Sequence, residues 1–371
     1  MQFIDLKTQY HHQKASIDSR MRAVMEHGQF IMGPEVRELE ETLANYVGAE
    51  HCISVSSGTH SLEIALRALG VGPGDEVITP TFSWISSAEV VMLVGATPVF
   101  VDINPDTYLA DINHIERAIT ENTKAIIPVS LFGQMPDLEA INTLAAKHDI
   151  TVIEDAAQSF GASQKGVKSC GASMIGSTSF FPAKPLGCYG DGGALFTSDA
   201  AIAERMRAIR THGGIKRHHH TLVGTNGRFD TLQAAALLGK WPYFEDEVLL
   251  RGQIGAQYSQ LLSGLNSAGL CKTPFVLAGN THVYAQYTLS VPPQKRDEIR
   301  AMLKEQDIPT GIYYPTCFHE QPVFASLGYR WGDFPESEKA SRSVLSLPIH
   351  PYLTEEELAK TTTAIKSYFK S

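Results

Sequence analysis

The strongest constraint on the fold of this chain is a regular exchange between two hydrophobic periods from residue 51 to residue 157. Segment 51–57, HCISVSS, has the continuous apolar run of a buried strand, whereas segment 61–69, SLEIALRAL, has apolar residues at helical spacing. Such alternation predicts an α/β fold in which helices cover a mainly parallel sheet and ligands bind at the carboxyl ends of the strands. The exchange repeats with strands predicted at 76–82, 97–103, 124–132 and 150–157 and helices at 85–95, 115–119 and 138–148.

The chain on either side of this region follows the same two periods. Apolar residues at positions 36, 39, 43 and 47 follow Pro34 at helical spacing, so the first helix is predicted there. After residue 240, a long amphipathic stretch is followed by VYAQYTLSV, DEIRAMLKEQ and EEELAKTTTAIKSYF, which indicate a smaller α+β unit. We therefore expect a large domain, residues 1–245, that includes the N-terminal segment and holds the cofactor inferred below, and a small C-terminal domain, residues 246–371.

Composition and charge narrow the class of function. A chain of 371 residues with 43% hydrophobic and 19% charged residues has material for a large core. Its 31 Lys and Arg against 40 Asp and Glu leave a formal charge of −9, which argues against binding nucleic acid by neutralising phosphates. We expect a protein that acts on small molecules.

Targeting signals and cysteines are read from the same sequence. The most apolar stretch, 90–101, is interrupted by Gly95, Thr97 and Pro98 and is shorter than the ~20 residues that span a bilayer. The opening MQFIDLKTQYHHQK lacks the succession of regions typical of a signal peptide. Five scattered cysteines without a C-x-x-C pair are typical of reduced thiols. We therefore expect a cytoplasmic protein without a membrane partner.

Two charged residues stand where a binding site is expected in such a fold. Asp155 ends the predicted strand ITVIED, which places its carboxylate at the mouth of the site, although an N-cap of a following helix is an equal alternative. Lys184 lies between an aromatic run and a glycine-rich loop in SFFPAKPLGCYGDGGA. A single lysine is usually a solvated surface group, so its interpretation depends on what accompanies it.

The accompanying residues match the needs of pyridoxal phosphate. This cofactor requires a lysine for a Schiff base, a carboxylate for its pyridine nitrogen, a phosphate cradle and a flat side chain against its ring. Lys184 and Asp155 are candidates for the first two roles, and a strand-to-helix turn offers free amides to an anion. A helix N-cap and core packing are the alternatives for the turn and for the aromatic residue. The candidates for the cradle and the flat side chain are Ser57, Gly58, Thr59, Ser179 and Trp84.

Two other motifs are rejected. Segment 171–178, GASMIGST, has the glycine spacing of a nucleotide-binding phosphate loop, but Ser177 stands where that loop requires lysine. The run His218–His220 lacks Cys or acidic partners at ligand spacing, and adjacent residues do not share a helical face. We expect no metal ion and interpret the histidines as part of a loop near a sugar site.

Six segments in order resemble the DegT/DnrJ/EryC1/StrS family of sugar aminotransferases. They are SSGTHSLEIAL, GDEVITPTFSWISSA, VIEDAAQSFGA, SFFPAKPLGCYGDGGA, VGTNGRFDTLQAA and LSLPIHPYLTEEE, and the resemblance extends from about residue 3 to about residue 355. It implies fold type I, the aspartate-aminotransferase-like architecture, with pyridoxal 5′-phosphate as cofactor. It also implies a homodimer whose active sites lie at the subunit interface.

The resemblance assigns roles by position. Lys184 corresponds to the Schiff-base lysine, Asp155 to the partner of the pyridine nitrogen, and Gln158 to a hydrogen-bond partner of the phenolate oxygen. Pro185 stands where many relatives carry Asn, a departure that leaves the lysine in place. The implied phosphate ligands are Gly58, Thr59, Ser179 and, from the other subunit, Asn226, with Trp84 stacked on the ring. The implied nucleotide-sugar contacts are Arg228, Tyr313, Tyr314 and His319.

The implied reaction moves an amino group from glutamate to the keto group of a nucleotide-linked sugar and releases 2-oxoglutarate. The stretch GIKRHHHTLVGTNGRFDTLQAA resembles members that aminate C3 of a UDP-linked 2-acetamido-3-keto-uronic acid, in the synthesis of bacterial surface polysaccharide such as the O-antigen of lipopolysaccharide. The cations of this stretch suit a substrate with a diphosphate and a carboxylate, and Arg228 is the first candidate to bind one of these groups. For Lys216 and Arg217 the alternative is a solvated basic loop.

Three alternative functions remain. A dTDP-3-keto-6-deoxyhexose or a C4 keto sugar is the alternative substrate. A dehydratase of the same fold carries histidine in place of the lysine, and Lys184 argues against it. A regulator that keeps the fold without the chemistry is distinguished by the colour of the bound cofactor.

Overall fold

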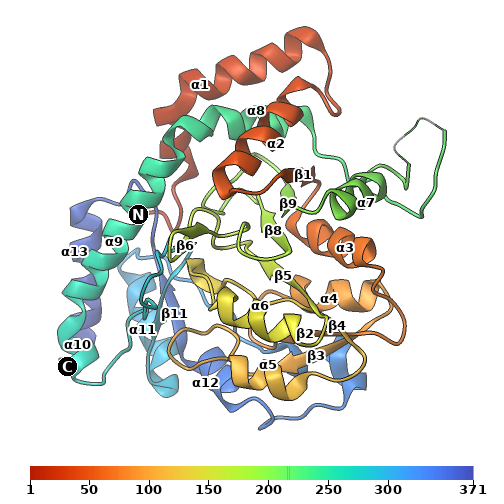
Figure 1. Ribbon diagram of the computed structural model, residues 1–371. Helices are drawn as coiled ribbons and strands as arrows, with labels where there is room; N and C mark the ends of the chain where they lie inside the picture. The colour runs from red at the N-terminus through yellow and green to blue at the C-terminus, as the bar shows by residue number, and fades with distance from the viewer. Residues whose placement is uncertain (215, 217, 371) are drawn as a thin grey trace.

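In the computed structural model, which describes residues 1–214, 216 and 218–370, a seven-stranded sheet forms the centre of the larger part of the chain (Figure 1). Its strands are β1 (His51–Val55), β2 (Glu76–Pro80), β3 (Thr97–Val101), β4 (Thr123–Ile126), β5 (Thr151–Asp155), β8 (Ile175–Ser179) and β9 (Gly193–Thr197). Their order is β1-β9-β8-β5-β4-β2-β3, and β9 runs antiparallel to both of its neighbours. The other neighbouring pairs are parallel, which confirms the predicted mainly parallel sheet.

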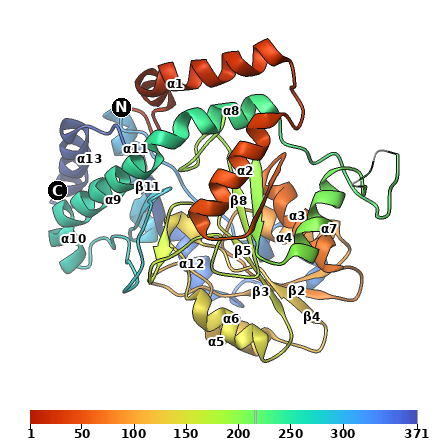
Figure 2. The ribbon, with the colours of Figure 1, turned by 45° about the horizontal axis from the view of Figure 1, so that its top comes forward.

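Helices cover both faces of this sheet, as the two views of Figures 1 and 2 show. On one face lie α3 (Gly58–Leu69), α4 (Ser86–Leu93) and α7 (Ala200–Arg210), whose apolar residues share a core with β1, β5 and β9. On the other face lie α2 (Pro34–Val47), α5 (Ile112–Ala118) and α6 (Leu138–Ala146). Outside α2 pack α8 (Thr231–Lys240) and α1 (Leu6–His27). A hairpin of β6 (Ser163–Gln164) and β7 (Val167–Lys168) follows β5.

The helix α1 was not predicted, because the first helix was expected only after Pro34. Its buried positions are Gln9, Gln13, Ile17 and Val24, so its inner face is half polar and gives no apolar stripe. Gln9 and Gln13 instead donate their amide N–H groups to the Glu247 carboxylate. Because polar contacts hold the inner face of α1, its sequence lacks the apolar residues at helical spacing from which a helix is predicted. Among the described residues, no helix is both long enough and apolar enough to cross a membrane.

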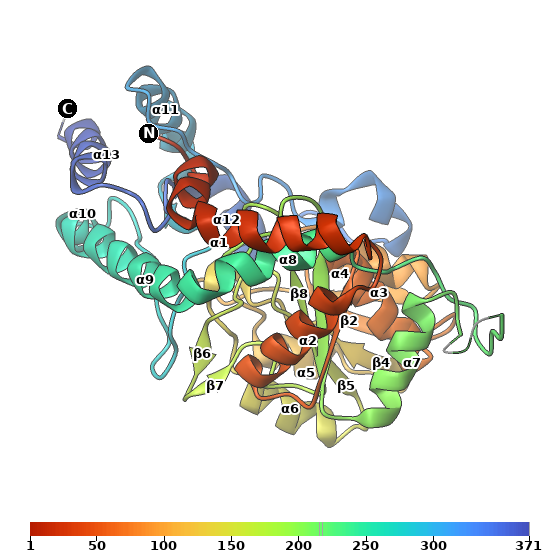
Figure 3. The same cartoon turned by 90° about the horizontal axis from the view of Figure 1, so that it is seen from above.

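A second core forms beyond Lys240. Residues from Ile254 to Ile365 pack around a two-stranded antiparallel sheet, β10 (Tyr287–Ser290) and β11 (Val344–Leu347). Figure 3 shows this unit to one side of the large sheet, joined to it through the long helix α9. Its helices are α9 (Phe244–Leu261), α10 (Ser263–Ser267), α11 (Pro293–Glu305), α12 (Pro335–Ser343) and α13 (Glu355–Tyr368). We propose the division into residues 1–245 and 246–371 on this basis.

The segment before α12 returns to the large sheet. Two short 3-10 helices, Phe318–Glu320 and Pro322–Leu327, place Phe318 and Phe324 against Phe100 of β3, with ring centroids 5.7 and 5.3 Å from it. This return brings Tyr313 and Tyr314 to the carboxyl ends of the strands, where the site lies.

Candidate active site

A cavity of about 460 Å³ opens where β2, β5 and β8 end, at the edge of the sheet where an α/β fold is expected to bind its ligand. Its lining comes from segments that lie far apart in the sequence, from Phe3 to Tyr314. Nine of the twelve residues to which the resemblance assigns a role lie in it, namely Gly58, Thr59, Trp84, Asp155, Gln158, Ser179, Lys184, Tyr313 and Tyr314, and the further cradle candidate Ser57 lines it as well. Asn226, Arg228 and His319 are outside the lining.

Asp155 is a buried residue in the lining of this cavity. Its Oδ2 accepts a hydrogen bond from Ser87 Oγ at 2.8 Å, and its Oδ1 accepts one from the Ala157 amide at 3.1 Å. Burial raises the pKa of the carboxyl, and these two hydrogen bonds and the charge of Lys184 oppose that rise. Residues 157–161 form turns rather than a helix, so the carboxylate does not serve as the N-cap that was its alternative interpretation.

Lys184 enters the cavity from a tight turn, in which its amide donates to the Phe181 carbonyl at 2.8 Å. Desolvation lowers the pKa of its ammonium to about 8, against the pull of the Asp155 charge in the other direction. A lysine with this pKa is partly neutral near pH 7.5, and the neutral amine is the form that attacks a carbonyl carbon.

The start of α3 borders the cavity, and Ser57 caps this helix by accepting a hydrogen bond from the His60 amide at 3.1 Å. The first-turn amides of a helix have no acceptor within the helix, and its N-terminus carries partial positive charge. A Cβ on Gly58 would stand 2.7 Å from the Cβ of Ser179, so the missing side chain lets this turn lie directly against the end of β8. Thr59 Oγ1 lies 2.6 Å from Ser86 Oγ, and together these hydroxyls surround the helix start.

Aromatic and amide groups form another wall. Trp84 is 58% exposed, which excludes its alternative role in core packing, and its ring centroid lies 5.9 Å from that of Tyr314. Gln158 Nε2 donates to the Tyr314 hydroxyl at 3.0 Å, while its Oε1 accepts from the Phe132 amide at 2.7 Å. The amide therefore holds Tyr314 at the cavity.

This donor set fits pyridoxal phosphate. The helix start beside Ser179 suits a phosphate, the exposed indole suits a flat ring, and Lys184 is poised for a carbonyl group. A pyridinium would neutralise the buried Asp155 carboxylate, whose raised pKa reflects a desolvation cost that its hydrogen bonds and Lys184 compensate only in part. The site therefore has a place for each part of the molecule.

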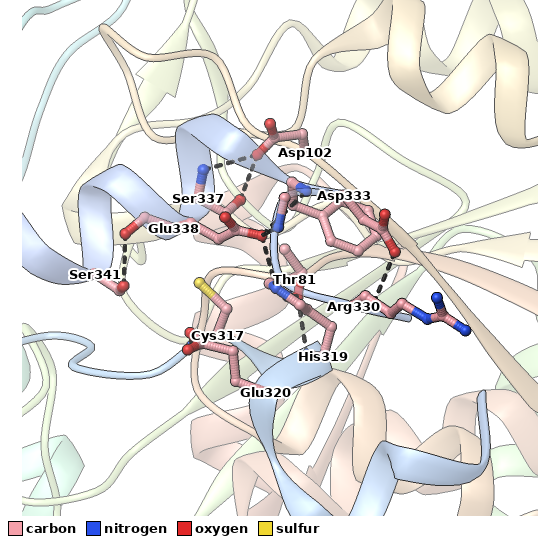
Figure 4. Close-up of polar contacts among 12 residues, drawn as sticks. Thr81, Asp102, Cys317, His319, Glu320, Arg330, Asp333, Ser337, Glu338 and Ser341 are labelled. Atoms are coloured by element: carbon pink, nitrogen blue, oxygen red, sulfur yellow. Dashed lines mark hydrogen bonds and ion pairs between the residues drawn. The ribbon is translucent and has the colours of Figure 1, made fainter. Parts of the chain in front are cut away.

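His319 lies outside this cavity, in the network drawn in Figure 4. Its ring nitrogens contact Thr81 Oγ1 at 2.9 Å and Glu338 Oε1 at 3.1 Å, and its side chain is buried. The Asp102 carboxylate, near the end of β3, accepts hydrogen bonds from the Ser337 amide and hydroxyl. In place of the expected contact with a nucleotide sugar, we propose that His319 fastens the returning segment, and with it Tyr313 and Tyr314, to the ends of β2 and β3.

Asn226 and Arg228 lie together on the surface between α7 and α8, where Arg228 Nε donates to Asn226 Oδ1 at 3.0 Å. Asn226 is exposed and Arg228 half-buried in this single chain. His218–His220 and Lys216 belong to the loop that extends outward after α7 in Figure 2, whereas Arg217 lies outside the described residues.

Sequence reasoning missed several residues of the site. Phe3 and Ile4 at the N-terminus and Gln286 before β10 line the cavity, and Ser87 holds Asp155. Phe3, Ile4 and Gln286 lie outside the six segments of the resemblance, and Ser87 lies within one of them but was given no role. Ser87 follows β2 and Asp155 ends β5. The two residues are brought together because β2 pairs with β4 and β4 pairs with β5.

Comparison with known proteins gives concordant matches. The sequence profile of the DegT/DnrJ/EryC1/StrS aminotransferase family matches residues 11–366. The chain is 51% identical to a UDP-2-acetamido-2-deoxy-3-oxo-D-glucuronate aminotransferase of Pseudomonas aeruginosa over 95% of this chain and 96% of that protein. It is 46% identical to a pleiotropic regulatory protein of Geobacillus stearothermophilus, over 99% and 98% of the two chains. The crystal structure of ntda from Bacillus subtilis with bound cofactor PMP superposes with a TM-score of 0.92 at 30% identity, covering 100% of this chain and 83% of that one.

Proposed function

Because the chain belongs to the DegT/DnrJ/EryC1/StrS aminotransferase family, it is a transaminase that uses pyridoxal 5′-phosphate, and we propose that it aminates C3 of a UDP-linked 2-acetamido-3-keto-uronic acid with glutamate as donor. The proposal places the enzyme in the cytoplasm, in the synthesis of a bacterial surface polysaccharide such as the O-antigen of lipopolysaccharide. The observation that carries the chemistry is that Lys184, Asp155 and the N-terminus of α3 line one cavity.

The residues of the chain have distinct parts in this reaction. When bound, the cofactor supplies an electron sink joined to the amino group in transfer. Lys184 would hold the cofactor through its Nζ, and the same amine would move the proton at the donor's α carbon. Asp155, whose carboxylate accepts a hydrogen bond from Ser87 Oγ, would keep a proton on the pyridine nitrogen. Gly58, Thr59 and Ser179 would hold the phosphate.

The substrate is inferred from its charges. A UDP-linked uronic acid carries a diphosphate and a carboxylate, so its binding requires cations in a chain whose formal charge is −9. Arg228, beside Asn226, offers a guanidinium that grips such groups through two parallel hydrogen bonds. The similarity to the P. aeruginosa aminotransferase, which is named for such a substrate, supports the same choice.

Substitution of Arg228 tests this choice. We expect Arg228→Ala to raise the KM for the UDP-uronic acid at least about tenfold, since charge-assisted pairs contribute roughly 1.5–3 kcal/mol, with the glutamate KM changed less than about twofold. Lys216→Ala, an exposed cation of the same region, is the matched control and should change neither constant appreciably. Both are measured by steady-state kinetics with each substrate varied in turn. Faster turnover of a dTDP-linked 3-keto-6-deoxy sugar or of a C4 keto sugar by the unaltered enzyme contradicts the uronic-acid proposal and leaves the aminotransferase assignment standing.

We further propose a homodimer with shared sites, in which Asn226 reaches the cofactor phosphate of the partner subunit. Its exposed position outside the cavity of its own chain supports this arrangement. Mixing inactive Lys184→Ala subunits with Asn226→Ala subunits should give each mixed dimer up to about half the activity of an unaltered dimer, because one of its two sites then has both residues intact. Activity and dimer mass are measured on the same sample. Mixed dimers that form without activity contradict the shared site.

A regulator remains the second candidate, since one similar protein is named as a pleiotropic regulatory protein. The cavity with its poised lysine favours catalysis. Purified protein loaded with pyridoxal phosphate distinguishes the two candidates: visible absorbance that glutamate bleaches supports the transaminase, and absorbance that does not respond to glutamate supports the regulator.

A further inference from the structure

Two side chains on one face of α8 form hydrogen bonds with the backbone of the loop that carries Lys184. Gln233 Oε1 accepts a hydrogen bond from the Tyr189 amide at 2.8 Å, and Lys240 Nζ donates one to the Gly187 carbonyl at 2.6 Å. Gln233 and Lys240 are seven positions apart, about two helical turns, so their side chains leave α8 on the same face. The helix itself is held by its packing against α1 and α2 (Figure 2).

Backbone contacts within this loop couple the position of Gly187 to that of Lys184. The Phe180 amide donates to the Gly192 carbonyl at 2.8 Å, and the Cys188 amide and thiol both point to the Phe180 carbonyl. A Cβ on Gly187 would stand only 2.3 Å from the Pro182 carbonyl oxygen, so the two arms of the loop are in direct contact. Any shift of Gly187 therefore displaces the turn from which Lys184 enters the cavity.

Lys240 is an unusual residue for a purely structural role. Its side chain is buried, and its Nζ contacts a neutral carbonyl and lies 4.3 Å from the centroid of the Tyr189 ring. Burial lowers its pKa to about 8, while the charges of Glu247 on α9 and of Cys188 act in the opposite direction. Burying a charge has a desolvation cost, which offsets the hydrogen bond that Nζ makes to the Gly187 carbonyl. Stability alone therefore does not account for a lysine here.

We propose that Lys240, with Gln233, is a positioning residue that holds the Lys184 loop at the geometry required for transamination. The proposal rests on the proposed function of Lys184. Neither residue lines the cavity; each contacts the backbone of the loop.

The test compares Lys240→Met and Gln233→Leu with Lys304→Met, an exposed lysine on α11. Both loop variants should speed amide hydrogen exchange in residues 185–191 of the cofactor-free protein by about tenfold, with exchange in β10 unchanged, because the released hydrogen bonds are local. Dissociation of pyridoxal phosphate should quicken and kcat fall, each by about tenfold, with both KM values within about twofold. The melting temperature of Lys240→Met should stay within about 3 °C of the unaltered protein.

Combining the two substitutions sharpens the test. Because both act on one loop, the double variant should lose much less kcat than the product of the two single losses, which marks coupled residues. Unaltered loop exchange and kcat in Lys240→Met overturns the proposal, as does a loss of melting temperature without faster exchange in the loop. If Lys240→Met fails to fold, Gln233→Leu alone decides by the same readouts. Hydrogen exchange is independent of turnover, so failure of the transaminase assignment and failure of the positioning proposal are distinguishable.

Discussion

Lys184→Arg is expected to remove transamination activity by roughly 10³-fold or more while leaving the fold intact. Arginine keeps the positive charge, but its guanidinium stays protonated and neither bonds covalently to the cofactor nor carries a proton at the donor's α carbon. Acid–base catalysis by one side chain contributes about 10²–10⁴-fold, and the loss of covalent binding adds to it. The measurements are kcat with glutamate, the visible absorbance of protein loaded with pyridoxal phosphate, and circular dichroism for the fold.

The pH dependence of cofactor attachment gives an independent check on Lys184. With a pKa of about 8 instead of 10.5, roughly a quarter of the amine is neutral at pH 7.5, against about one part in a thousand for an ordinary lysine. In the unaltered cofactor-free protein, the rate of covalent attachment should therefore rise with pH and level off above about pH 8. A rate that still rises steeply at pH 10, or full turnover by Lys184→Arg, contradicts the assignment.

Local patterns and long-range contacts differ in what the sequence reveals about this protein. The turn at Gly58 and the loop at Lys184 are each recognisable within a dozen residues, since the glycine before a helix and the lysine between an aromatic run and glycines are local features. Phe3 and Gln286 reach the same cavity only because the N-terminus and the second core fold over the strand ends. Nothing near them in the sequence carries that information.

Two departures from expectation have one physical cause. Helix α1 packs through Gln9 and Gln13 on Glu247, and His319 is buried between Thr81 and Glu338. In both places polar side chains are satisfied by distant polar partners, whereas sequence reasoning treats polar residues as exposed or functional. The partners lie 234 and 238 residues away for Gln13 and His319. Only the folded chain shows which polar residues are paired.

Asp155→Asn should lower kcat by about 10²–10³-fold while the protein still binds pyridoxal phosphate. A neutral amide keeps the shape and the contact with Ser87 but does not stabilise a proton on the pyridine nitrogen, and removing one preorganised charge-stabilising group typically has an effect of this size. Turnover and cofactor absorbance are measured together. Rates within about tenfold of the unaltered enzyme mean that another acid serves the ring nitrogen.

The neighbouring carboxylate provides the matched control. Glu154 precedes Asp155 on β5, but it accepts hydrogen bonds from Ser130 Oγ, Ser169 Oγ and the Cys170 amide at 2.7–2.8 Å, away from the cavity. Glu154→Gln should therefore lower the melting temperature, because its amide N–H₂ meets groups that themselves donate, while the kcat of the folded fraction changes much less than in Asp155→Asn.

Asp155→Asn, which is expected to lower kcat, should not lower the stability of the cofactor-free protein. Burial raises the pKa of Asp155 above its value in the unfolded chain, so the folded state binds this proton more tightly, and stability falls as pH rises through the folded pKa. Asp155→Asn removes that penalty, and its melting temperature without cofactor at pH 7–8 should equal or exceed that of the unaltered protein. With bound pyridoxal phosphate, the unaltered protein should have the higher melting temperature. The cationic ring interacts more favourably with the Asp155 carboxylate than with the amide of Asp155→Asn. A variant that is less stable without cofactor would show that Asp155 serves the fold, whereas the expected reversal identifies a charge kept for its ligand.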